Sequence, residues 1–250
     1  MPSKGIRAYF EIDDAGREAE RERRLRGAEL RVLGAFLLLS GAVAGGLLSF
    51  VFPLNLIPAA LLFGTASKVI DDGRRLGSPS AAAALSRDPR PPLLFLRAFV
   101  DDGSFSRPNW LLTTMLSLVP IGYANRRLSH EEELVRVIKH LGPVVAVGRP
   151  GERLPGLGAA RLYLPHEQWQ AGVKALMDRS QLVILRIWQG VLWELRTAIE
   201  LVAPERLVIY AEPPVLPSRV TELIPADLPA GCHRFLYFDP DWTPSVAPSM

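Results

Sequence analysis

The pattern of apolar and charged positions divides the chain into two unlike parts. Residues 32–67 contain no Asp, Glu, Lys, Arg or His, whereas residues 17–31 carry ten charges. As one helix this apolar run would be about 54 Å long at 1.5 Å per residue, well beyond the ~30 Å core of a bilayer. Because Pro53 cannot continue a helix and Asn55 favours a turn, the run is expected to fold back on itself. The two expected spans are residues 32–52 and 55–70.

Basic residues on both sides of the run predict how it lies in a membrane. Those before it are Arg17, Arg21, Arg23, Arg24, Arg26 and Arg31, and those after it are Lys68, Arg74, Arg75, Arg87 and Arg90. By the positive-inside rule, both termini and the C-terminal domain are expected in the cytoplasm, with the hairpin in the inner membrane and the lipid bilayer as its partner. The alternative is a buried helical pair in a soluble protein. Charge-free runs of this length are rare in soluble cores, which favours the membrane.

From residue 92 onward, short apolar runs alternate with helical segments. The expected strands are residues 93–100, 144–147, 161–164, 181–187, 207–211 and 235–238, and the expected helices are residues 129–141, 166–179 and 191–202. Strands that are apolar throughout and separated by single helices are typical of a parallel sheet covered on both faces. This pattern predicts a flavodoxin-like, doubly wound α/β domain. The expected organisation is a charged segment (1–31), a transmembrane hairpin (32–70), a linker (71–91) and the α/β domain (92–250).

One segment does not fit the alternating pattern. Residues 108–125 carry no charge and have Trp110 and Tyr123 near their ends. At 14 residues, the part from Trp110 to Tyr123 is too short to span a bilayer. It either lies in the membrane interface, where Trp and Tyr favour the headgroup level, or packs as a helical insertion on the domain's own core.

Composition and charge exclude several classes of function. The net charge is only +3, and because the arginines cluster beside the apolar run, the basic character indicates membrane topology rather than nucleic-acid binding. The single cysteine, Cys232, excludes an internal disulfide and fits a reducing compartment. The four histidines show no metal-ligand spacing, so no metal site is expected.

Ligands of open parallel sheets bind beyond the carboxyl ends of the strands. The candidate ligand-binding residues at these positions are Arg97, Phe99, Asp101, Arg149, Arg153, Trp188 and Trp193. An arginine within an apolar strand needs an anionic partner, and for Arg97 this is either a ligand phosphate or an internal carboxylate such as Asp101. The glycine-rich loop around Arg149 and Arg153 has neither the P-loop nor the Rossmann spacing, so it either holds a phosphate or is an ordinary connection.

Glu194 is the candidate catalytic residue. It lies in the first turn of a helix, directly after a strand and beside tryptophans. Aromatic surroundings raise the pKa of a carboxylate, whereas a helix N-terminus lowers it. A carboxylate in such a place can stabilise or attack a ribosyl cation. The simpler alternative, which spacing alone favours, is a glutamate that complements the helix dipole.

Three features together resemble the Toll/interleukin receptor (TIR)-like group of flavodoxin-like domains, which includes relatives of the nucleoside deoxyribosyltransferases. They are the opening strand LLFLRAFVDD, the middle strand QLVILRI, and the helix start at Trp193 and Glu194, and the resemblance covers about residues 92–212. Two apolar spans before such a domain are similar to those of bacterial two-span membrane proteins. The resemblance implies binding of NAD or a related nucleotide as ligand or substrate, with no separate cofactor. In catalytic members it implies cleavage of the nicotinamide–ribose bond by a helix-borne glutamate.

Only Glu194 matches that catalytic role. TIR enzymes usually place the glutamate four residues after the tryptophan, and that position here is Thr197. Two functions from different classes therefore remain open. One is a membrane-anchored NAD glycohydrolase or nucleoside-transferase-like enzyme, and the other is a non-catalytic signalling or scaffold protein that acts by self-association. A homo-oligomer is expected.

Overall fold

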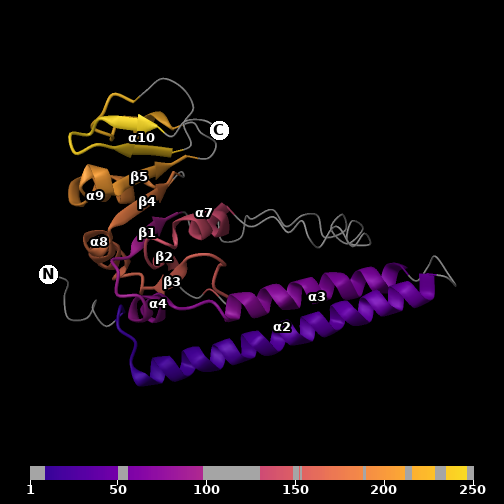
Figure 1. Ribbon diagram of the computed structural model, residues 1–250. Coiled ribbons are helices and arrows are strands. Elements are labelled where there is room, and N and C mark those ends of the chain that lie inside the picture. Colours follow the sequence, from indigo (N-terminus) through magenta and orange to yellow (C-terminus); the bar gives the residue numbers. More distant parts are fainter. Residues whose placement is uncertain are drawn as a thin grey trace.

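The computed structural model describes residues 9–49, 56–97, 130–148, 152, 154–187, 190–211, 216–228 and 235–246. These residues form a long helical hairpin and an α/β domain, and the hairpin projects from one side of the domain (Figure 1). The expected turn at residues 52–55 and the charge-free segment 108–125 lie outside the described residues.

The hairpin consists of α2 (Asp14–Ser49) and α3 (Leu56–Leu76). The charged segment and the described part of the first apolar span form one continuous helix, with no break at residue 32. The reason is that the segment before Val32 contains mainly good helix formers such as Arg, Glu and Ala and no proline after the start of α2. Within the described residues, no helix has both the length and the apolar character needed to cross a membrane.

Small residues bring the two helices of the hairpin close together. A Cβ atom at Gly27 would lie 2.5 Å from the carbonyl oxygen of Gly73, and one at Gly34 would collide with the side chain of Ile70. Ala66 is fully buried at the same interface. Residues without a side chain let helix backbones approach each other, so this interface depends on glycine.

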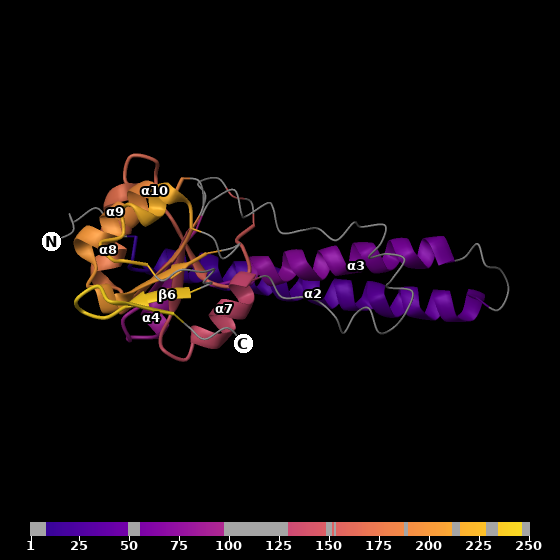
Figure 2. The ribbon, with the colours of Figure 1, turned by 90° about the horizontal axis from the view of Figure 1, so that it is seen from above.

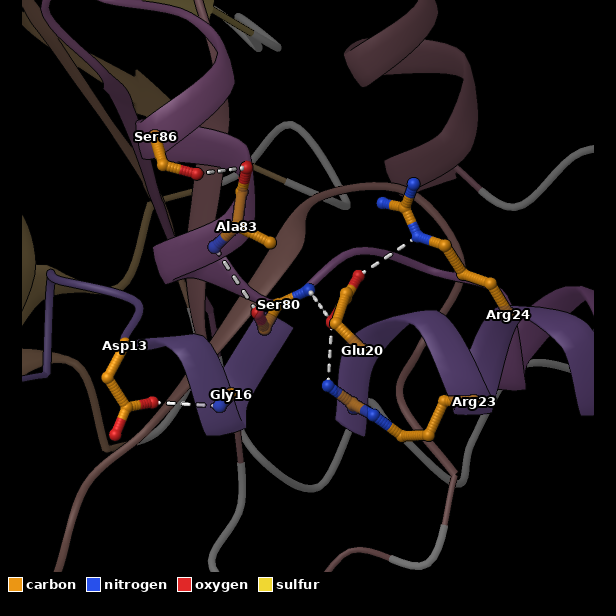
Figure 3. A network of polar contacts seen from close by, with 8 residues as sticks. All are labelled: Asp13, Gly16, Glu20, Arg23, Arg24, Ser80, Ala83 and Ser86. Atoms are coloured by element: carbon orange, nitrogen blue, oxygen red, sulfur yellow. Dashed lines mark hydrogen bonds and ion pairs between the residues drawn. The ribbon is translucent and has the colours of Figure 1, made fainter. Parts of the chain in front are cut away.

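Helix α4 (Ala81–Arg87) occupies part of the region expected to be a linker, and it is joined to the hairpin by Glu20. The buried Glu20 carboxylate accepts hydrogen bonds from Arg23 (2.7 Å), Arg24 (3.1 Å) and the backbone N–H of Ser80 (3.4 Å) (Figure 3). Ser80 is also the N-cap of α4, since its hydroxyl accepts the N–H of Ala83. The base of α2 is therefore tied to the α/β domain.

The domain contains a seven-stranded, mostly parallel sheet in the order β3-β2-β1-β4-β5-β6-β7. Its strands are β1 (Leu93–Leu96), β2 (Val144–Gly148), β3 (Ala160–Tyr163), β4 (Leu182–Arg186), β5 (Leu207–Tyr210), β6 (Phe235–Phe238) and β7 (Pro244–Val246). The parallel α/β arrangement predicted from the sequence is confirmed for β1 to β5. Strand β6 instead pairs antiparallel with β5, and β7, which was not expected, pairs antiparallel with β6. Apart from the edge strand β3, the parallel strands run β2-β1-β4-β5, which is how the first four strands of a flavodoxin-like sheet are ordered.

Helices cover both faces of the sheet (Figures 1 and 2). The helices of the domain are α7 (His130–Ile138), α8 (Trp169–Arg179), α9 (Leu192–Leu201), the 3-10 turn η3 (Pro204–Arg206) and α10 (Ser218–Thr221). Alternate residues of β1 face opposite ways: Leu93 and Phe95 belong to the core cluster under α7, whereas Leu94 and Leu96 belong to the larger cluster under α8 and α9. The larger cluster also includes Phe10, which lies just before α2 and beneath the guanidinium of Arg179.

Candidate functional site

The strand order changes direction between β1 and β4. From β1 the chain builds the sheet through β2 and β3 toward one edge, and from β4 it builds through β5 toward the other edge. The two strands pair directly, with Leu93 opposite Leu182 and Leu96 opposite Leu185. Crevices at such switch points, beyond the carboxyl ends of the strands, are where doubly wound domains bind ligands. The residues that follow β1 and β4 are therefore the ones to consider.

Glu194 lies at this edge, in the first turn of α9 just after β4. Its side chain is half-buried, and its Oε2 atom is buried and accepts no hydrogen bond from any described residue. Burial raises the pKa of the Glu194 carboxyl above its usual range, and a hydrogen bond from its own backbone N–H opposes this only in part. Desolvation therefore outweighs this backbone hydrogen bond, and carboxylates with a raised pKa are found in many active sites.

Two tryptophans contact each other at the starts of α8 and α9. Trp193 precedes it on α9, and Trp169 is the first residue of α8; their ring centroids are 4.6 Å apart with the planes at 64°. Both rings are half-buried against the larger core cluster. Trp193 was expected to contact a ligand, whereas Trp169 was not among the candidate residues. The sequence does contain a signal that Trp169 lies at the carboxyl end of a strand. Trp169 is in the first helical turn after β3, just as Trp193 is in the first helical turn after β4.

Arg97 follows β1 and forms an internal ion pair. Its Nε atom lies 2.9 Å from Oε2 of Glu131, which is at the start of α7, and both side chains are buried. The same carboxylate receives Arg161 from β3, with Nη1 2.7 Å from Oε1 and Nη2 3.0 Å from Oε2. Of the two expected partners for Arg97, a ligand phosphate or an internal carboxylate, the structure places a carboxylate beside it, and that carboxylate is Glu131.

The structure does not bring Arg97 and Glu194 together. Arg97 continues the alternation of Leu93 and Phe95 toward the α7 face, where Glu131 lies. Glu194 lies on α9, which covers the opposite face of the sheet. The two side chains therefore lie on opposite faces of the sheet, and Arg97 pairs with Glu131 on the α7 face.

The glycine-rich loop after β2 closes over this ion cluster. Gly158 has a φ of +118°, and a Cβ there would lie 2.9 Å from Cγ of Glu131; a Cβ at Gly156 would collide with the guanidinium of Arg161. The backbone N–H of Ala159 donates to Oε1 of Glu131 at 3.0 Å. Glycine at these two positions therefore lets the backbone pass close to the buried charges of Glu131 and Arg161.

Five of the expected ligand-binding residues lie outside the described residues: Phe99, Asp101, Arg149, Arg153 and Trp188. Within the part of the chain that the structure describes, no group of three or more His, Cys, Asp or Glu side chains is placed to hold a metal ion. The chain was compared with known protein families, curated proteins and solved structures, and no match was found in any of the three.

Proposed function

We propose that the α/β domain is TIR-like, binds NAD or a related nucleotide beyond β1 and β4, and cleaves the nicotinamide–ribose bond with Glu194. We further propose that α2 and α3 anchor it in the inner membrane, with both termini and the domain in the cytoplasm. The observation that carries the catalytic part is the half-buried Glu194 carboxylate at the switch point of the sheet.

The chemistry needs an anion beside the ribose. When the bond between the ribose C1′ and the nicotinamide nitrogen breaks, its electron pair leaves with nicotinamide and C1′ becomes cationic. A desolvated carboxylate interacts strongly with such a cation, because little water screens the two charges. The hydroxyl of a water molecule then adds to C1′, its proton passes to solvent, and the products are nicotinamide and ADP-ribose. For this Glu194 must be ionised, so turnover is expected to fall as the pH drops through its raised pKa.

The remaining binding roles follow from the surroundings of Glu194. Trp169 and Trp193 present half-buried aromatic surface on which a flat base can stack. Because Arg97 is paired with Glu131, phosphate binding is assigned to Arg149 and Arg153 instead. In this proposal the base stacks on the tryptophans, while the carboxylate of Glu194 faces the ribose.

The register of the hairpin supports the membrane anchor. Gly34 of α2 lies against Ala66 and Ile70 of α3, so the two ends of the charge-free run, at residues 32 and 67, come to about the same level. Above that level α2 exposes large apolar side chains, with Val32 at 70%, Phe36 at 65% and Leu39 at 64% exposure. An aligned polar boundary followed by exposed apolar surface is typical of helices that enter lipid.

The enzymatic part is tested by nicotinamide release from NAD by membranes that contain the full-length protein. We expect the wild type to release nicotinamide and Glu194→Gln at equal abundance to lose at least about 100-fold of that rate, the scale of a removed catalytic group. The control Glu200→Gln changes an exposed glutamate of the same helix and should leave the rate unchanged. Turnover retained by Glu194→Gln contradicts its catalytic role. Intact NAD with the wild type, combined with self-association of the protein, would favour the non-catalytic scaffold.

The anchor is tested separately by alkaline extraction of the membranes and by labelling of the single cysteine, Cys232. The full chain should stay in the membrane pellet, and a membrane-impermeant maleimide should label Cys232 only after the cytoplasmic side is opened. Release into the alkaline supernatant contradicts the anchor, and labelling of intact cells contradicts the orientation.

A further inference from the structure

The positive charge of the protein is concentrated at the base of the hairpin. We call residues 20–31 of α2 and residues 68–75 of α3 the basic belt. The first part holds five arginines against three glutamates, and the second holds three basic residues against two aspartates. The belt therefore has a net charge of +3, which equals the net charge of the whole chain. The rest of the protein is balanced.

The two parts of the belt lie side by side. Gly27 of α2 packs against Gly73 of α3, and a Cβ at Gly73 would lie 3.1 Å from Cγ of Arg31. Arg31 therefore lies next to the turn of α3 that carries Arg74 and Arg75. The belt forms one band around the hairpin, directly below the charge-free run.

Internal ion pairs use only some of the basic side chains in the belt. Glu20 holds Arg23 and Arg24, Glu22 holds Arg26, and Asp72 lies 3.4 Å from Lys68. Among the described residues, no ion pair involves Arg21, Arg31, Arg74 or Arg75. Arg31 donates only to the backbone carbonyl of Gly27, and its side chain is exposed.

We infer that the basic belt binds the phosphates of anionic phospholipid headgroups, with Arg31, Arg74 and Arg75 as the main contacts. This inference rests on the membrane anchor proposed above. Guanidinium groups form paired hydrogen bonds with phosphate oxygens, and basic side chains at the headgroup level are attracted to anionic leaflets. A zwitterionic headgroup carries the same phosphate, but its own cation offsets the charge. The belt therefore selects for net negative lipid, and the exposed apolar surface above it lies in the acyl chains.

The test uses the full chain in nanodiscs of equal parts phosphatidylglycerol and phosphatidylcholine, with the lipids that stay bound after release counted by native mass spectrometry. The wild type should retain phosphatidylglycerol over phosphatidylcholine. The variant Arg31→Gln/Arg74→Gln/Arg75→Gln should lose about tenfold or more of that preference. The control Lys174→Gln/Arg196→Gln/Arg219→Gln removes the same charge from exposed positions on α8, α9 and α10, which lie away from the hairpin (Figure 1), and should keep the preference.

Equal retention of the two lipids by the wild type overturns the inference, as does an unchanged preference in the belt variant. Thermal unfolding of both triple variants shows whether they are folded. The alkaline extraction described above tests the membrane anchor separately. Release of the protein into the supernatant would contradict the anchor. A protein that resists extraction but shows no headgroup preference contradicts only the role of the belt.

Discussion

At the scale of single residues, the burial of Glu194 has a consequence for stability as well as for reactivity. Its pKa is raised in the folded state by desolvation, above the value of about 4.5 for an exposed glutamate. The folded protein therefore holds this proton more tightly than the unfolded chain. The contribution of Glu194 is fully favourable below the unfolded pKa and is lost as the pH rises through the folded pKa.

We expect Glu194→Gln, which cannot ionise, to be more stable than the wild type above that pH window. The gain in urea midpoint should be present at pH 8 and should disappear as the pH is lowered toward 4.5. Urea unfolding of both proteins across this range measures the difference. A gain that does not change with pH would mean that Glu194 is not desolvated. The same substitution should abolish turnover, so stability and activity would change in opposite directions.

Glu131 is the residue on which the buried arginines depend. Its carboxylate contacts both Arg97 and Arg161, and all three side chains are buried. Removal of one partner from a buried ion pair leaves an uncompensated charge, so Glu131→Ala should lower the free energy of unfolding by about 3–5 kcal/mol. Glu133→Ala, two positions along the same helix but exposed, should change it by less than about 0.5 kcal/mol. Similar effects of the two substitutions in chemical unfolding would contradict this role.

At the scale of secondary-structure elements, the α2–α3 interface should be intolerant of side chains at Gly27. A Cβ there meets backbone atoms of Gly73 and Gly77, which cannot move without separating the helices. Gly27→Leu should therefore lower the unfolding free energy by about 1–3 kcal/mol, even though leucine favours a helix over glycine. Ala35→Leu adds a similar side chain at an exposed position of α2 and should be tolerated. Thermal unfolding of the full chain in mild detergent compares the two variants, and equal midpoints would contradict close packing at Gly27.

Local sequence signals account for most elements but not for how they are joined. The ranges of β1 to β6 and of α7 to α9 follow from apolar runs and helix stops, and observed ends differ from expected ones by a few residues. The antiparallel direction of β6 has no local signal, because a short apolar strand reads alike in either direction. Helix α4 was missed although it has local signals, since Ser80 is its N-cap and residues 81–84 are alanines, which favour a helix.

The candidate site shows the same division. The position of Glu194 at a strand's carboxyl end follows from the order of strand and helix, and the structure places it there. The partner of Arg97 could not be chosen from the sequence, because the first turn of α7 contains three consecutive glutamates. In the folded protein it is Glu131 that reaches Arg97. Pairing between distant charges is decided by the fold.

At the scale of the whole molecule, two contacts among the described residues couple the hairpin and its N-terminal approach to the domain. Phe10 enters the larger core cluster beneath Arg179, and Glu20 holds the N-terminus of α4 through Ser80 (Figure 3). The hairpin then projects on the side of the domain where α7 lies, away from α8 and α9, in both views (Figures 1 and 2). Because Arg97 meets α7 at the carboxyl end of β1, the edge with the candidate site is directed toward the side on which the hairpin extends.

If Glu20 sets this orientation, Glu20→Gln should loosen the joint without unfolding the sheet. The amide loses the negative charge that holds Arg23 and Arg24, and the N–H of Ser80 loses a charged acceptor. Hydrogen exchange should therefore speed up in α4, whereas the amides of β4, in the centre of the sheet, should keep their protection. Glu22→Gln is the matched control, because Glu22 is exposed and pairs only with Arg26 among the described residues. Unchanged exchange in α4 would mean that Phe10 and the helix packing fix the hairpin without Glu20. Faster exchange in both α4 and β4 would mean that Glu20 stabilises the whole domain rather than its joint with the hairpin.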